Sequence, residues 1–185
     1  MVSAYDELPR TPANFVALSP LRYLDRAAYI YPNQDAIIHG KRRISWRETY
    51  NRCRQFAQQL QKLGIGKNDT VSVLLPNIPA MLEAHFAVPM IGAVLNTLNT
   101  RLDAKTIAFM LEHAETKVLL VDPEFAPLAK EALSLVSQPI YVIDEDDEEY
   151  EQCFSTPIGQ IEYEDWLAEG DAEFEWHLPS DEWDA

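Results

Sequence analysis

The sequence predicts an α/β fold built from βαβ units, with a parallel sheet between two layers of helices. Three short apolar runs rich in β-branched residues lie in mid-chain, at residues 71–75, 93–97 and 117–121. Two segments with helical periodicity separate these runs. Strands that alternate with helices favour a parallel sheet in three layers. Because ligands of open α/β sheets bind beyond the carboxyl ends of the strands, a functional surface is expected at that edge.

The elements before the sheet follow from local signals. Residues 1–19 are expected to form an irregular arm that contains two prolines. A helix is predicted to begin with Ser19 as its N-cap. Residues 35–39 and 42–45 predict a two-stranded hairpin joined by a glycine-containing turn. The basic tip of this hairpin, residues 41–43, is either an anion-binding patch or a solvated turn.

Two helices are expected on either side of the first sheet strand. An S-x-x-E capping box at residues 45–48 begins a long helix, and Gly64 ends it. One side of this helix carries basic residues, which are expected to be solvated: Arg47, Arg52, Arg54 and Lys62. Asn77 is the predicted N-cap of the next helix. Glu83 and His85 in that helix do not share a face, so His85 is expected to be a packing or satisfied histidine rather than a catalytic one.

The βα alternation continues at least to residue 143. Further elements are expected at residues 103–113 (helix), 124–136 (helix), 140–143 (strand) and 163–169 (helix). Between the last two lies an acidic run, DEDDEEYE, at residues 144–151. It lacks calcium-loop spacing with a central glycine, so a solvated loop is expected rather than a metal site. The expected organisation is an arm (1–19), an α/β subdomain (20–143), and an acidic loop, short helix and interrupted tail (144–185).

Charge is unevenly distributed along the chain, whose net charge is −15. Residues 1–130 hold all 15 Lys and Arg and 12 Asp and Glu, whereas residues 131–185 hold 18 Asp and Glu and no Lys or Arg. The acidic part would repel phosphate, which argues against nucleic-acid binding. No apolar run reaches about 18 residues, so no membrane span is expected. The two cysteines form no metal or redox motif and no secretory pattern begins the chain, so a cytoplasmic location is expected.

The central stretch carries a resemblance to a known family. Residues 74–113 read LLPNIPAMLEAHFAVPMIGAVLNTLNTRLDAKTIAFMLEH, and the similarity continues through LSPLRYLDRAAYIYPNQDAIIHG before them and IEYEDWLAEGDAEFEWHLPSDEWDA after them. This sequence resembles the N-terminal part of the AMP-forming acyl-CoA synthetases, in the adenylate-forming ligase superfamily. The most similar branch activates medium-chain, short-chain or related carboxylic acids.

The resemblance implies a fold, a reaction and a set of ligands. The fold would be the N-terminal portion of the large domain of an adenylate-forming ligase. The reaction would join a carboxylic or fatty acid to coenzyme A through an acyl-adenylate, with ATP and Mg²⁺. The partners would be the small carboxylic acid or fatty acid substrate and the remainder of the ligase or another subunit.

One loop contains the candidate cofactor-binding residues. Residues 96–101, NTLNTR, leave the second predicted strand and enter a helix capped by Asp103. Arg101 could hold a phosphate or carboxylate in a forked contact. In the similar family this segment lies near the approach of the coenzyme A chain, which implies that role for Asn99, Thr100 and Arg101. The alternative is a loop whose side chains satisfy their own backbone.

The sequence holds no phosphate-binding loop for ATP. Its six glycines are scattered, and none lies in a G-x-x-x-x-G-K pattern. In the similar family the Ser/Thr/Gly-rich ATP loop follows the position that corresponds to residue 185. No catalytic or metal-binding residue is therefore assigned, and the chain is expected to be inactive by itself. The alternative is a truncated, non-catalytic binding module or a split subunit completed by another chain.

Overall fold

The parallel sheet of the α/β prediction is present. The computed structural model describes residue 9, residues 11–147, residue 149 and residues 156–178. Within them one sheet has the strand order β4-β3-β5-β6-β7, and all neighbours are parallel. The strands are β3 (Thr70–Leu74), β4 (Val94–Thr97), β5 (Thr116–Val121), β6 (Tyr141–Asp144) and β7 (Ile161–Glu162). β7 is an additional strand that was not predicted, because two residues give no readable pattern.

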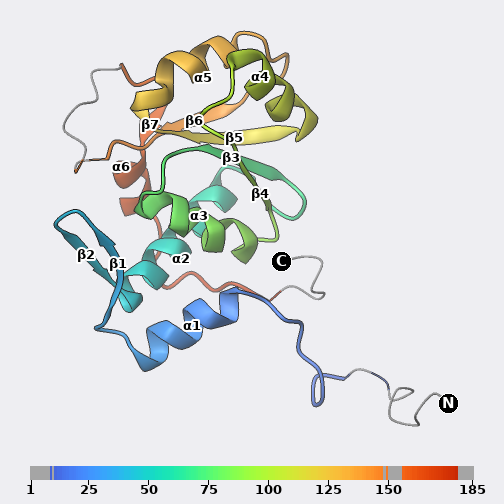
Figure 1. Cartoon of the computed structure of the whole chain (residues 1–185). Helices are drawn as coiled ribbons and strands as arrows, with labels where there is room; N and C mark the ends of the chain where they lie inside the picture. The colour runs from blue at the N-terminus through green and yellow to red at the C-terminus, as the bar shows by residue number, and fades with distance from the viewer. Residues whose placement is uncertain (1–8, 10, 148, 150–155, 179–185) are drawn as a thin grey trace.

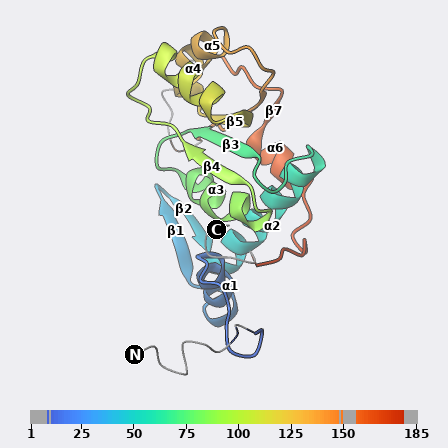
Figure 2. The same cartoon turned by 90° about the vertical axis from the view of Figure 1, so that its right-hand side faces the viewer.

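Helices cover both faces of the sheet and make the expected three layers (Figure 1). One face carries α4 (Ala104–His113) and α5 (Ala126–Leu133), and the other carries α2 (Trp46–Lys62), α3 (Pro79–Met90) and α6 (Tyr163–Ala168). Outside the layers are α1 (Leu21–Ile30), the antiparallel hairpin of β1 (Asp35–His39) and β2 (Arg42–Ser45), and the short 3-10 helix η1 (Pro123–Phe125). Figure 2 shows α1 at the end of the molecule opposite α4 and α5.

Alternate strand residues supply two hydrophobic cores. In β5, Val118 and Leu120 pack into the core beneath α2 and α3, whereas Leu119 and Val121 pack into the core beneath α4 and α5. This separation follows from the two-residue period of a β-strand. All four side chains are buried, so the strand is apolar on both faces, as parallel strands between helices are.

The predicted caps are confirmed for two helices. Ser45 is the N-cap of α2, and its hydroxyl accepts a hydrogen bond from the Glu48 backbone N–H at 3.2 Å. Asp103 is the N-cap of α4, and its carboxylate accepts from the Thr106 N–H at 2.9 Å. Each side chain satisfies one of the backbone donors that a helix start leaves free.

Two predicted N-caps are wrong by one residue. Proline holds the first position of α3, so the preceding residue, Ile78, is the N-cap instead of Asn77, and it makes no side-chain cap. In α1 the N-cap is Pro20, although the Ser19 hydroxyl still accepts from the Leu21 N–H at 3.3 Å. None of the helices in the described part of the chain has the length and apolar character needed to cross a bilayer.

The strand order creates a switch point at the carboxyl edge of the sheet. From β3 the chain moves to β4 on one side, and it then returns to β5 on the other side of β3. The connections after β3 and β5 therefore diverge, which opens a crevice where ligands of such sheets bind. The expected functional edge is thus the one beyond Leu74, Thr97, Val121 and Asp144.

Candidate functional site

Three acidic side chains that follow β5 and β6 are buried: Asp122, Asp144 and Glu145. The Asp122 carboxylate accepts from the Glu124 N–H at 2.7 Å and caps η1. The Asp144 carboxylate accepts from the two N–H groups of residues 158–159 at 3.1 and 2.6 Å. In contrast, Glu145 Oε2 has no hydrogen-bond partner in the described part of the chain. A buried polar atom left in this way is costly, and it marks the edge as a candidate site.

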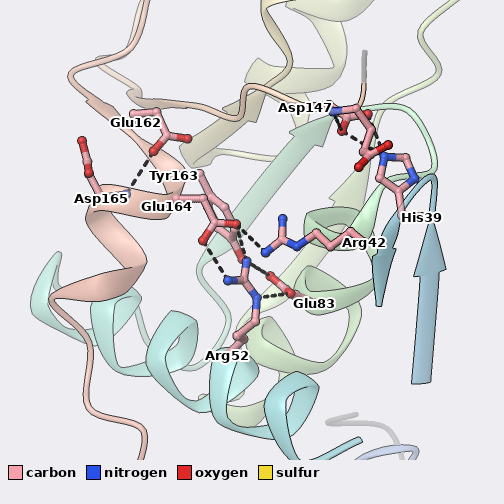
Figure 3. Close-up of polar contacts among 10 residues, drawn as sticks. His39, Arg42, Arg52, Glu83, Asp147, Glu162, Tyr163, Glu164 and Asp165 are labelled. Carbon is pink, nitrogen blue, oxygen red and sulfur yellow. Dashed lines mark hydrogen bonds and ion pairs between the residues drawn. The ribbon is translucent and has the colours of Figure 1, made fainter. Parts of the chain in front are cut away.

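A network of charged side chains lies beside this edge (Figure 3). The Arg52 guanidinium donates to Glu83 Oε1 at 2.5 Å and to Glu164 at 2.7 and 2.8 Å. The Tyr163 hydroxyl donates to Glu83 Oε2 at 2.6 Å, and Arg42 donates to Glu164 at 3.1 Å. The Glu83 side chain is fully buried and that of Arg52 is 11% exposed. The network therefore joins α2, α3, α6 and β2 through charge-assisted bonds.

The protonation of this network follows from burial and partners. Burial opposes the charge of Arg52, but its bonds with Glu164 and Glu83 outweigh burial and raise its pKa. Burial also opposes the charge of Glu164, yet the bonds from Arg52 and Arg42 lower the pKa of that carboxyl. Burial and the charge of Glu83 raise the pKa of the Tyr163 hydroxyl well above its ordinary value, so it keeps the proton that it donates.

Next to the network is a cavity of about 810 Å³, which we call the acidic cavity. Its lining includes two basic residues, Lys41 and Arg42, and a larger set of carboxylates: Glu145, Asp146, Asp147, Glu149, Glu162 and Glu164. Burial raises the pKa of Glu145 well above its ordinary value, and the charges of Glu83 and Glu164 add to the effect. Two guanidinium groups already pair with Glu83 and Glu164, and none in the described part of the chain forms a hydrogen bond with Glu145.

The expected solvated acidic loop is wrong at its beginning. Asp144 and Glu145 are each 4% exposed, because the chain continues the β5–β6 pairing through a bond from the Glu145 N–H to Val121. Asp147 lies 2.9 Å from His39 Nε2 in the hairpin. Residues 148 and 150–151 of the run lie outside the described residues. In the described part of the chain, no three Asp, Glu, His or Cys side chains are grouped to hold a metal ion.

The basic residues of the hairpin tip and of α2 also have partners in the chain. The solvated interpretation is wrong for Arg42 and Arg52, which bind Glu164. It is wrong as well for Arg54, whose Nε donates to the Phe174 carbonyl at 2.7 Å. These contacts hold the segment after β7 against α2, which explains why that helix carries basic residues on its outer side. The partner carboxylate and carbonyl lie more than 100 positions away in the sequence, so no local signal could have revealed these contacts.

The two residues singled out in α3 behave differently from one another. His85 is exposed, and its Nδ1 lies 2.7 Å from the Met81 carbonyl one turn earlier, so it is a histidine satisfied within its own helix. Glu83 instead points into the network beside Arg52 and Tyr163. A lone glutamate on an apolar helix was the signal that could have identified it, because buried carboxylates need partners.

The predicted cofactor residues follow β4 at the same edge of the sheet. Asn99 and Arg101 are exposed, and Thr100 is half-buried. The Asn99 side-chain oxygen accepts from the Arg101 backbone N–H at 3.0 Å, as the self-satisfied alternative expects. The guanidinium of Arg101 pairs with no carboxylate among the described residues. β3 and β5 separate this loop from Glu145 at the end of β6, so the loop and the acidic cavity are separate features.

The residues present do not make a complete site for ATP or Mg²⁺. No glycine-rich loop with a lysine occurs in the sequence to cradle a triphosphate. Among the residues that the structure describes, no carboxylate group is arranged for a hard cation. No reaction step can therefore be derived from this chain's own side chains alone.

Comparison with known proteins defines the class. Residues 24–173 match the family of AMP-binding enzymes, and the chain belongs to that family. It is 46% identical to a peroxisomal acetate/butyrate–CoA ligase of Arabidopsis thaliana, over 96% of this chain and 33% of the relative. It is 47% identical to an acetate–CoA ligase of Humulus lupulus and 43% identical to a peroxisomal trans-cinnamate:CoA ligase of Petunia hybrida. The chain spans about a third of the length of these relatives.

Solved structures support the fold. An anthranilate CoA ligase in complex with anthranoyl-AMP superposes with a TM-score of 0.78 at 20% identity, over 96% of this chain and 32% of that one. The N-terminal subdomain of NpsA from Klebsiella oxytoca superposes with a TM-score of 0.60 at 18% identity, over 86% of this chain and 35% of that one. The resemblance stated from the sequence is thus confirmed: the chain belongs to the AMP-binding enzyme family, and it is similar to about a third of the length of named CoA ligases.

Proposed function

We propose that this chain forms the first α/β subdomain of a ligase that activates a small carboxylic acid with ATP and transfers the acyl group to coenzyme A. The observation that carries this proposal is identity of 46–47% over 96% of the chain to two named CoA ligases. In the proposed reaction a carboxylate oxygen attacks the α-phosphorus and pyrophosphate leaves. The coenzyme A thiol then attacks the acyl carbonyl and releases AMP. Mg²⁺ would screen the phosphates when it is bound.

The chain's own contribution would be a scaffold and one wall of the coenzyme approach. We infer that Arg101, exposed after β4, offers a forked contact for a phosphate of coenzyme A, with Asn99 and Thr100 beside it. Asn99 already orders the Arg101 backbone at 3.0 Å, which supports a fixed loop shape. A substitution of Arg101 should therefore raise the KM for coenzyme A in the full-length ligase without changing the KM for ATP.

The acid is proposed to be a small aliphatic or aromatic carboxylic acid. Relatives are named as ligases of acetate, butyrate, benzoate and trans-cinnamate, which share a carboxylate but differ in the attached group. AMP formation by the full-length gene product, measured across short aliphatic, aromatic and medium-chain fatty acids, tests the proposal. Acid-dependent AMP release with a short aliphatic or an aromatic acid supports it, whereas release with medium-chain acids alone, or no release with any acid, contradicts it.

A second function is favoured for the 185-residue chain when it is alone. The sequence contains no ATP loop, so we propose that the isolated chain is inactive and acts as a binding module or as one part of a split ligase. A cytoplasmic location also remains a proposal, because several relatives are peroxisomal by name. Fluorescence microscopy of the tagged full-length gene product separates the two compartments.

A further inference from the structure

The acidic cavity contains a buried carboxyl group with an oxygen that no group in the described part of the chain satisfies. Glu145 lines the cavity, is 4% exposed, and has an Oε2 atom without a hydrogen-bond partner among the described residues. Its neighbours Glu83 and Glu164 already hold both guanidinium groups of the network. Lys41 lines the same cavity, but it makes no ion pair with Glu145 among the described residues. The Glu145 carboxyl is therefore open to a further cation or a proton.

The geometry favours an organic cation over a metal ion. No grouping of three potential ligands suits a metal in the described part of the chain. By contrast, this region already binds guanidinium groups well, since Arg52 makes paired bonds with Glu164 at 2.7 and 2.8 Å. A further Arg or Lys side chain would complete the same chemistry at Glu145.

The source of that side chain follows from charge and length. Residues 131–185 hold 18 Asp and Glu and no Lys or Arg, so this segment has no surplus positive charge. The relatives are about three times as long as this chain. We propose that the acidic cavity is the docking site for a basic surface of the rest of a ligase polypeptide, which places an Arg or Lys side chain against Glu145. This inference rests on the proposed function as part of a ligase.

Docking is expected to be coupled to the release of a proton from Glu145. In the chain alone, burial and neighbouring negative charge raise the pKa of Glu145, whereas a partner cation would lower it. The charged groups that surround it come from every adjacent element: Lys41 in the turn before β2, Arg42 on β2, Arg52 on α2, Glu83 on α3, Asp146, Asp147 and Glu149 after β6, Glu162 on β7 and Glu164 on α6. Binding of the basic surface should therefore release a proton and strengthen as the pH rises.

The test uses a hexa-arginine peptide and the 185-residue chain. Isothermal titration at low ionic strength compares the wild type, Glu145→Gln and the matched control Glu131→Gln, which removes one exposed charge on α5. We expect Glu145→Gln to weaken binding about tenfold or more, because a charge-assisted bond is lost, and Glu131→Gln to change it less than about twofold. Titrations in two buffers should show proton release from the wild type and none from Glu145→Gln.

Several outcomes would overturn the inference. They are equal affinities for the two variants, no binding by the wild type, or displacement of the peptide by Mg²⁺ at matched ionic strength. Measuring the stability of each variant separates weaker binding from a folding defect. Glu145→Gln should not destabilise the isolated chain. The peptide titration does not depend on catalysis. Peptide binding with no ligase activity would leave the cavity assignment intact and contradict the proposed function.

Discussion

Arg52 and Glu83 form a forked ion pair inside the molecule. Arg52 Nε lies 2.5 Å from Glu83 Oε1, and Nη2 lies 3.2 Å from Oε2. Glu83 is fully buried. Two residues of α6 complete the hydrogen bonds of the pair: the Tyr163 hydroxyl donates to Glu83, and the Glu164 carboxylate accepts from Arg52 (Figure 3). This pair joins α2 to α3 on one face of the sheet. Tyr163 lies 80 positions from Glu83, and Glu164 lies 112 positions from Arg52, so the network also fixes the segment after β7.

Removing one partner of this pair should strongly destabilise the chain. Among the described residues, Arg52→Met leaves the buried Glu83 carboxylate with only the Tyr163 hydroxyl as a donor, and a broken buried pair costs about 3–5 kcal/mol of unfolding free energy. Urea unfolding measures the loss. The control Arg47→Met changes an exposed arginine of the same helix and should cost less than about 0.5 kcal/mol. Similar losses for both variants would show that the pair does not stabilise the fold.

The Tyr163 hydroxyl should contribute separately. Tyr163→Phe keeps the buried ring but removes the 2.6 Å bond to Glu83, which should lower the unfolding free energy by about 1–3 kcal/mol. Urea unfolding again provides the measurement. Tyr23→Phe, at a side chain that is 67% exposed, is the control and should have little effect. An unchanged stability in Tyr163→Phe would mean that the hydroxyl is equally well satisfied by water.

The fold was predictable because its signals are local. Apolar runs mark β3, β4 and β5, and a capping side chain marks the start of α2 and α4. The network was not predictable in the same way. Arg52 and Glu164 are 112 positions apart, so only the folded chain brings them together. A basic residue on an amphipathic helix ordinarily indicates a solvated face, and here the later α6 covers it.

Stability should fall as the pH rises through the titration of Glu145. Burial raises its pKa in the folded chain above the ordinary value of 4.5, so between these two values the folded state binds more protons than the unfolded state. Glu145→Gln stays uncharged and should remove this decline. Thermal unfolding at about pH 4 and about pH 8 should give similar midpoints for both proteins at the lower pH and a higher midpoint for the variant at the higher pH. A less stable variant at both pH values would contradict the assignment.

Gly159 should not tolerate a side chain. A Cβ atom there would lie 2.7 Å from Asp144 Oδ2 and 2.9 Å from the Val142 carbonyl oxygen. The same glycine donates its N–H to Asp144 at 2.6 Å, so Gly159→Ala should break the contact that leads the chain into β7. We expect a loss of about 1–3 kcal/mol in urea unfolding. Gly66→Ala is the control, because nothing lies within 4 Å of its added carbon. Equal stability of the two variants would contradict the close packing.

The site illustrates a different limit of sequence reasoning. Asn99, Thr100 and Arg101 were recognisable because they follow a predicted strand, and their role in binding coenzyme A stays a prediction. Glu145 was not recognisable as a buried residue, because it belongs to an acidic run of the kind that is typical of a solvated loop. Its burial depends on the extension of β6 beside β5, and a charge pattern alone cannot show that extension.

Acid-dependent exchange of labelled pyrophosphate into ATP tests the central claim most directly. The 185-residue chain and the full-length gene product would be assayed side by side with acetate and butyrate. The account predicts no exchange by the chain alone and clear exchange by the full-length protein, since the chain supplies the first subdomain and no ATP loop. Exchange by the purified chain alone, or no exchange by the full-length protein with any acid, would contradict it.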